Sequence, residues 1–84
     1  QTEIDIMGEQ DSESAIFAEC KWRNEKVDLD VLETLVDRSG LFHYTKVQYF
    51  LFSKTGFTKG CVEKARKMGN VTLVRYEDIV SLKR

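Results

Sequence analysis

The stretch Ala15–Trp22, with the sequence AIFAECKW, decides the fold predicted for this chain because its residues alternate with a period of two. One face of such a strand carries small or apolar residues, whereas the other carries Phe17 and the charged residues Glu19 and Lys21. Upstream, residues 2–7 (TEIDIM) alternate in the same way, and a polar segment (GEQDSES) separates the two runs. We therefore expect an antiparallel hairpin.

Downstream of the hairpin, the hydrophobic spacing changes from that of a strand to that of a helix. Residues 29–40 have helical spacing and end in a glycine, and residues 46–52 (KVQYFLF) are apolar enough for a strand covered on both faces. A second helix is expected between Thr58 and Gly69, followed by a strand over residues 71–76 and a short helical turn over residues 78–82. The predicted order is β-β-α-β-α-β, an α/β domain whose mixed sheet is flanked by helices.

Length, charge and cysteine content restrict the class of protein. With 84 residues, the chain is expected to be one domain over residues 1–84. We expect no membrane span and no secretion leader, and Cys20 and Cys61 form no disulfide framework, so a cytoplasmic location is predicted. A net charge of −1 argues against a protein dedicated to coating nucleic acid. It does not exclude an enzyme that meets phosphate through a metal ion.

The charged face of the hairpin forms the candidate site. With the turn centred near Asp11, Asp5 is expected across from Phe17 and diagonal to Glu19. Asp5 and Glu19 would supply carboxylates to magnesium, the Cys20 carbonyl would add a backbone oxygen, and Lys21 would act on the attacking water or the phosphate. A second interpretation is an ordinary wet hairpin face, on which neighbouring Glu and Lys side chains stabilise the surface.

The segments Glu19–Arg23 (ECKWR) and Ser53–Phe57 (SKTGF), with Asp5 upstream, resemble known proteins. The first resembles the PD-(D/E)xK motif of the restriction-endonuclease-like fold, and the later strand, turn and helix look like its Mrr-like branch. More narrowly, residues 3–79 are similar to a C-terminal domain of unknown function in archaeal and bacterial AAA-type ATPases. The resemblance implies that Asp5 and Glu19 bind metal and that Lys21 is the catalytic lysine.

The resemblance also implies a function and partners. We expect a magnesium-dependent nuclease domain that hydrolyses nucleic-acid phosphodiesters, with DNA as partner, cut from a longer chain that contains an ATPase domain. The first helix of the family core is absent here, and the uncovered apolar sheet face that results favours a homodimer. Two alternatives stay open: an inactive module of the same fold that oligomerises or regulates the ATPase, and a domain that binds DNA non-specifically.

Other residues have less specific interpretations. His43 is expected in a loop or at a helix end, and Trp22 is expected in the core, while Arg23 could contact a nucleic-acid backbone. Residues 53–55 form either a capped turn or a phosphate site before a helix. The basic residues 59–67 are expected on the solvated face of that helix.

Overall fold

The chain folds as four strands and two helices in the expected order. The computed structural model describes residues 2–76, the first five of them through their backbone, so the expected helical turn over residues 78–82 lies outside the described part. The elements are β1 (Thr2–Glu9), β2 (Ser14–Trp22), α1 (Leu29–Ser39), β3 (Lys46–Ser53), α2 (Lys59–Met68) and β4 (Val71–Arg75). The α/β class and the β-β-α-β-α-β order are therefore confirmed.

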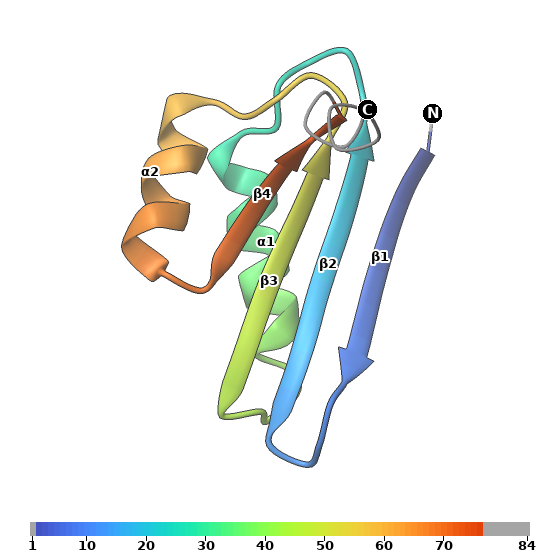
Figure 1. The fold of residues 1–84 in the computed structure, drawn as a ribbon, viewed down its shortest axis with the longest axis vertical. Coiled ribbons are helices and arrows are strands. Elements are labelled where there is room, and N and C mark those ends of the chain that lie inside the picture. The colour runs from blue at the N-terminus through green and yellow to red at the C-terminus, as the bar shows by residue number, and fades with distance from the viewer. Residues whose placement is uncertain (1, 77–84) are drawn as a thin grey trace, which may run out of the picture.

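The strands form one mixed sheet in the order β1-β2-β3-β4 (Figure 1). β1 is antiparallel to β2, whereas β2, β3 and β4 are parallel to one another. In Figure 1 these three strands run toward the top of the view and β1 runs the other way. The carboxyl ends of the three parallel strands consequently meet at one edge of the sheet, which is called the carboxyl edge below.

The register of the hairpin differs from the expected one. Asp5 pairs directly with Glu19 rather than with Phe17, and Glu3 pairs with Lys21. The expectation that Asp5 lies diagonal to Glu19 is therefore wrong. Since side chains alternate with a period of two, a shift of two residues changes the partners without exchanging the faces of the strands.

Turn chemistry explains the shift. Glu9 pairs with Ala15, so the hairpin is centred on Ser12, one residue later than the sequence suggested. The Asp11 carboxylate accepts a hydrogen bond from the Glu13 amide at 2.8 Å, and the Gln10 amide donates to the Ser14 carbonyl at 2.9 Å. An Asp side chain that binds the backbone two residues on stabilises this kind of turn, and this turn selects the register.

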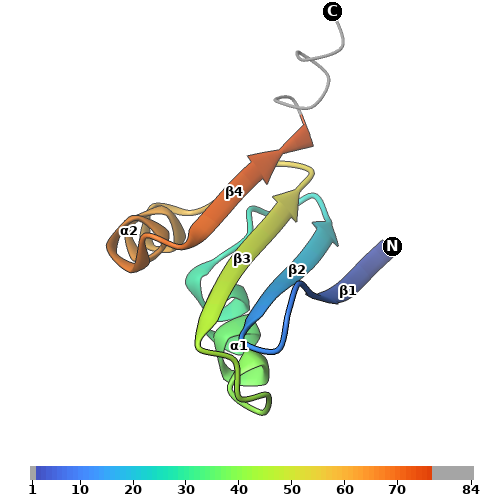
Figure 2. The same cartoon turned by 60° about the horizontal axis from the view of Figure 1, so that its bottom comes forward.

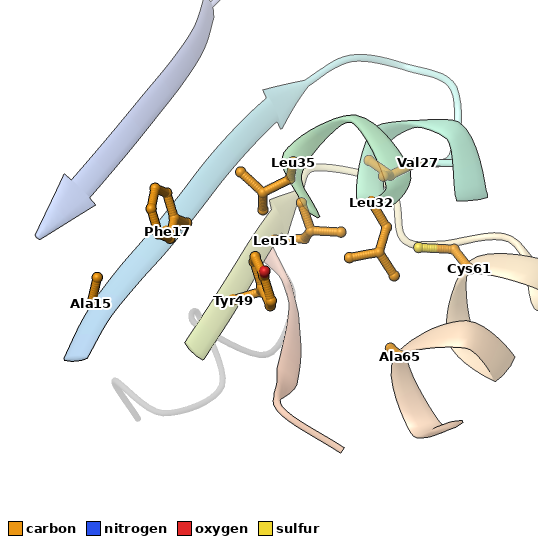
Figure 3. Close-up of a cluster of buried hydrophobic side chains, with 9 residues drawn as sticks. All are labelled: Ala15, Phe17, Val27, Leu32, Leu35, Tyr49, Leu51, Cys61 and Ala65. Carbon is orange, nitrogen blue, oxygen red and sulfur yellow. The ribbon is translucent and has the colours of Figure 1, made fainter. Parts of the chain in front are cut away.

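Both helices pack on one face of the sheet (Figure 2). β3 was expected to be covered on both faces, but within residues 2–76 the helices cover only the face that carries Phe17 and Leu51. Figure 3 shows the core side chains gathered between β2, β3 and the two helices. The core consists of Ala15, Phe17, Val27, Leu32, Leu35, Tyr49, Leu51, Cys61 and Ala65.

The helix starts are tied to each other. Asp28 caps α1 by accepting from the Leu29 amide at 2.7 Å, and it also accepts from the Thr58 hydroxyl at 2.7 Å. Thr58 in turn caps α2 by accepting from the Cys61 amide at 3.3 Å. Gly69 ends α2 in the left-handed conformation, with φ 78°, as expected. The two loops that leave β2 and β3 are therefore held together at the carboxyl edge.

Candidate functional site

Glu19 lies in the middle of β2 on the face that the helices cover. It is only 3% exposed, because β2 lies between β1 and β3 and its neighbour on β3 is the fully buried Leu51. Few carboxylates are buried to this degree, and those that are normally have a cation or several hydrogen-bond donors as partners. Among residues 7–76, Glu19 is therefore the residue whose burial most needs an explanation.

Lys21 supplies one partner. Residues two apart on a strand share a face, and the Lys21 ammonium Nζ lies 2.7 Å from Glu19 Oε2. The lysine side chain is itself 11% exposed, so this ion pair is largely removed from water. The other carboxylate oxygen, Glu19 Oε1, is buried and has no hydrogen-bond partner among the described residues. As far as the described residues go, one carboxylate oxygen is thus satisfied and the other is not.

The backbone of β1 brings Asp5 to the same place. Asp5 pairs directly with Glu19, and Cα atoms of directly paired residues are about 4.5–5.5 Å apart. The three predicted residues Asp5, Glu19 and Lys21 are therefore on adjacent strands at adjoining register positions. Cys20 differs, because its side chain lies on the other face of β2 and only its carbonyl oxygen could serve as a ligand.

A cavity of about 200 Å³ opens beside the Glu19–Lys21 pair, between β2 and α1. At about 30 Å³ of liquid volume per molecule, it has room for several waters. Its lining combines charges of both signs and consists of Glu19, Lys21, Arg23, Asp30, Val31, Thr34 and Arg38. No group of three metal-binding side chains occurs within the part of the chain that the structure describes.

Four of the lining residues, Asp30, Val31, Thr34 and Arg38, come from α1 and were not predicted. Asp30, Thr34 and Arg38 follow one another at intervals of four, so they form a line along one side of the helix. That spacing was visible in the sequence. The packing of α1 against β2, which brings this line to Glu19, was not.

The loop after β3 is built around a buried serine hydroxyl. Ser53 is 2% exposed; its Oγ donates to the Gly56 carbonyl at 2.8 Å and accepts from the Gly56 amide at 2.9 Å. Gly56 has φ 120°, which favours glycine. Lys54 Nζ then donates to Asn24 Oδ1 at 3.2 Å, and Thr55 donates to the Glu25 carbonyl at 2.7 Å. The SKTGF segment therefore forms a capped turn that joins two loops of the carboxyl edge.

The remaining sequence expectations divide into one error and several agreements. Trp22 is not a core residue, because it is 38% exposed on the face of the sheet away from the helices. His43 lies exposed in the loop between α1 and β3, as expected. The basic side chains of α2 are exposed too, namely Lys59, Lys64, Arg66 and Lys67. Burial raises the pKa of the Cys61 thiol to about 11, which suits an inert core residue.

Comparison with known proteins gives a partial match. Residues 1–34 match the model of the family DUF234, described as archaea bacterial proteins of unknown function. The matched segment contains β1, β2 and the first part of α1, and thus the positions of Asp5, Glu19 and Lys21. No curated protein and no solved structure matches the chain. Among residues 2–76, no helix has the length and apolar character needed to cross a membrane.

Proposed function

We propose that this chain is a nuclease-like domain of the PD-(D/E)xK type that hydrolyses DNA phosphodiesters with magnesium and is joined to an ATPase in a longer protein. The observation that carries the proposal is the environment of Glu19. This carboxylate is buried, one of its oxygens contacts Lys21 at 2.7 Å, and the other has no partner within residues 2–76. A cation held beside that oxygen would supply the missing partner.

The residues present fit magnesium. This ion takes oxygen ligands, and proteins bind it through one or two carboxylates while waters and substrate phosphate complete its coordination. Glu19 Oε1, the Asp5 position opposite and the Cys20 carbonyl would hold the ion. Bound there, magnesium supplies charge stabilisation at the phosphate and lowers the pKa of a coordinated water.

The chain's own contribution centres on Lys21. The ion pair with Glu19 holds the ammonium group at the wall of the cavity, where it can donate a hydrogen bond to a phosphate oxygen or to the attacking water. The lysine is therefore positioned before substrate arrives, and little reorganisation is needed when negative charge develops on the phosphate. Arg23 and Arg38 add positive charge to the rim of the same cavity.

The test is nicking of supercoiled plasmid DNA by the 84-residue chain with magnesium and with EDTA. We expect metal-dependent nicking that Glu19→Gln and Lys21→Met each abolish. Glu33→Gln and Lys46→Met are matched controls, because they alter exposed residues outside the cavity and should leave the rate unchanged. Nicking that persists in EDTA or in Glu19→Gln would contradict the proposal, as would the lack of nicking with any divalent metal.

A second candidate function, a non-catalytic module that oligomerises or regulates the ATPase, rests on the other face of the sheet. Within residues 2–76 no helix covers that face, where Phe50 and Phe52 stack with their ring centroids 6.5 Å apart and remain half-buried. This candidate predicts no cleavage with any metal and a defined dimer in sedimentation. Plain DNA binding without chemistry, by contrast, predicts salt-sensitive binding that survives Glu19→Gln.

A further inference from the structure

Two exposed aromatic side chains meet at the carboxyl edge, on the face of the sheet away from the helices. Trp22 at the end of β2 is 38% exposed and Tyr76 just after β4 is 46% exposed, and their rings meet edge to face with centroids 5.1 Å apart. The ammonium of Lys54 lies 5.9 Å from the centre of the Trp22 ring. We call Trp22, Tyr76 and Lys54 the aromatic platform. Large rings that remain this accessible contribute little to the core.

The platform lies at an edge of the sheet where cations outnumber acids among the described residues. Although the whole chain has a net charge of −1, the carboxyl edge carries five cations: Lys21, Arg23, Lys26, Lys54 and Arg75. The same edge also carries Glu25 and Asp28, and Lys21 is paired with Glu19, so the five cations exceed these three acids by two. In open α/β sheets, ligands bind outside the carboxyl ends of the parallel strands. The region therefore suits an anionic ligand that also offers a flat ring.

The platform adjoins the candidate active site. An open hollow of about 360 Å³ is lined by Trp22, Lys54 and Arg23 together with Asn24 and Glu25. Arg23 also lines the cavity that contains Glu19 and Lys21, so this side chain forms part of the wall of both spaces. Lys21 and Trp22 are consecutive residues of β2 that lie on opposite faces of the sheet. A chain that passes over the end of β2 would touch both.

We propose that the aromatic platform stacks an unpaired nucleobase of the strand whose phosphate lies at Glu19 and Lys21, so that the substrate is single-stranded or locally unpaired. The inference rests on the proposed nuclease function and adds its substrate class. Bases of an intact duplex are already stacked, whereas unpaired bases stack on exposed aromatic rings beside cations that track the backbone. An exposed cation–π contact is weaker than base stacking, so a base can replace the Lys54 ammonium on the Trp22 ring. The displaced ammonium of Lys54 is then able to contact a phosphate of the same strand.

The test uses the fact that Trp22 is the only tryptophan of the chain. We would titrate the 84-residue chain with a twelve-nucleotide oligo-dT in EDTA and follow tryptophan fluorescence. We expect saturable quenching, with an affinity that falls as salt rises. A duplex of equal length should bind at least tenfold more weakly. An oligo-U of the same length distinguishes RNA from DNA as the source of the base.

Variants test the individual contacts by anisotropy of a labelled oligonucleotide. Trp22→Ala should weaken oligo-dT binding about tenfold, which corresponds to the loss of one stacked base. Trp22→Phe should retain most of the binding, because a smaller ring still stacks. Phe42→Ala is the matched control: Phe42 is also 46% exposed but contacts Phe17, away from the carboxyl edge, so its loss should leave the affinity unchanged. Circular dichroism establishes that each variant is folded.

The outcomes separate the platform from the chemistry. Binding without a change in Trp22 fluorescence, or equal affinity for duplex and single strand, would overturn the platform. If Glu19→Gln and wild type both fail to nick DNA while oligo-dT still quenches Trp22, the catalytic proposal fails and the platform stands. If nicking is intact and Trp22→Phe and Trp22→Ala both bind oligo-dT like the wild type, only the platform fails.

Discussion

Replacing Lys21 with methionine tests how much the free energy of unfolding depends on the ion pair between Glu19 and Lys21. The change leaves the Glu19 carboxylate 3% exposed with neither oxygen partnered within residues 2–76. Removing one member of a buried pair costs about 3–5 kcal/mol, and the partial exposure of Lys21 places our expectation at the lower end, about 3 kcal/mol. An 84-residue domain has only about 4–13 kcal/mol of total stability. The single variant should therefore lose roughly a quarter to three quarters of its stability and stay folded in the absence of denaturant.

The double variant Glu19→Met with Lys21→Met should recover most of this loss. Two methionines fill similar volume without charge, and replacing a buried pair by apolar side chains is often neutral or stabilising by about 1–4 kcal/mol. We would measure the free energy of unfolding of the wild type, both single variants and the double variant in urea, with Lys46→Met as the exposed control. Simple addition of the two single effects would refute the reasoning.

Three further predictions concern the cap, the core and the thiols. The hydrogen bonds from the Thr58 hydroxyl and the Leu29 amide lower the pKa of Asp28. The stability that Asp28 contributes is therefore complete above its unfolded-chain pKa of about 3.9 and is lost as pH falls through the lower folded-state pKa. Asp28→Asn should remove this part of the acid dependence of the urea midpoint. Leu32→Ala removes a side chain with 0% exposure and should cost about 2–5 kcal/mol in the same assay. With a disulfide reagent at pH 8, Cys20 should react well before Cys61, because the Cys61 thiol is buried and has its pKa raised to about 11. Equal reaction rates of the two thiols would contradict the packing of α2.

Local sequence signals were sufficient for the fold. The period of two in Ala15–Trp22 predicted β2, and Thr58 and Gly69 predicted the ends of α2, because each of these signals depends only on near neighbours. The hairpin register was not predictable in this way. The polar segment before β2 offers several turn centres, and the bond from the Glu13 amide to the Asp11 carboxylate selects one of them.

The candidate site was predictable only as far as strand pairing determines it. A hairpin brings Asp5 near Glu19 and Lys21 in either register, so that part did not depend on the turn. The contributions of Asp30 and Arg38 depend on how α1 packs against β2, which no local pattern records. Trp22 was assigned wrongly for a related reason: β2 has apolar residues on both faces, and the alternation does not say which face the helices cover.

The structural and functional interpretations of Glu19 differ in what they require of one oxygen atom. An ordinary wet hairpin face would leave this carboxylate in solvent, where an ion pair with lysine contributes at most about 1 kcal/mol. Here the helices cover that face, and Oε1, which has no partner among the described side chains, costs about 1–3 kcal/mol of desolvation in a small domain. A solvated surface pair has no such desolvation cost. A cation that binds the folded chain at Glu19 would offset this cost, because any ligand selective for the folded state raises stability. The burial of Glu19 thus favours a binding site over a surface ion pair, and the adjoining cations of the carboxyl edge favour phosphate as the group that the cation would meet.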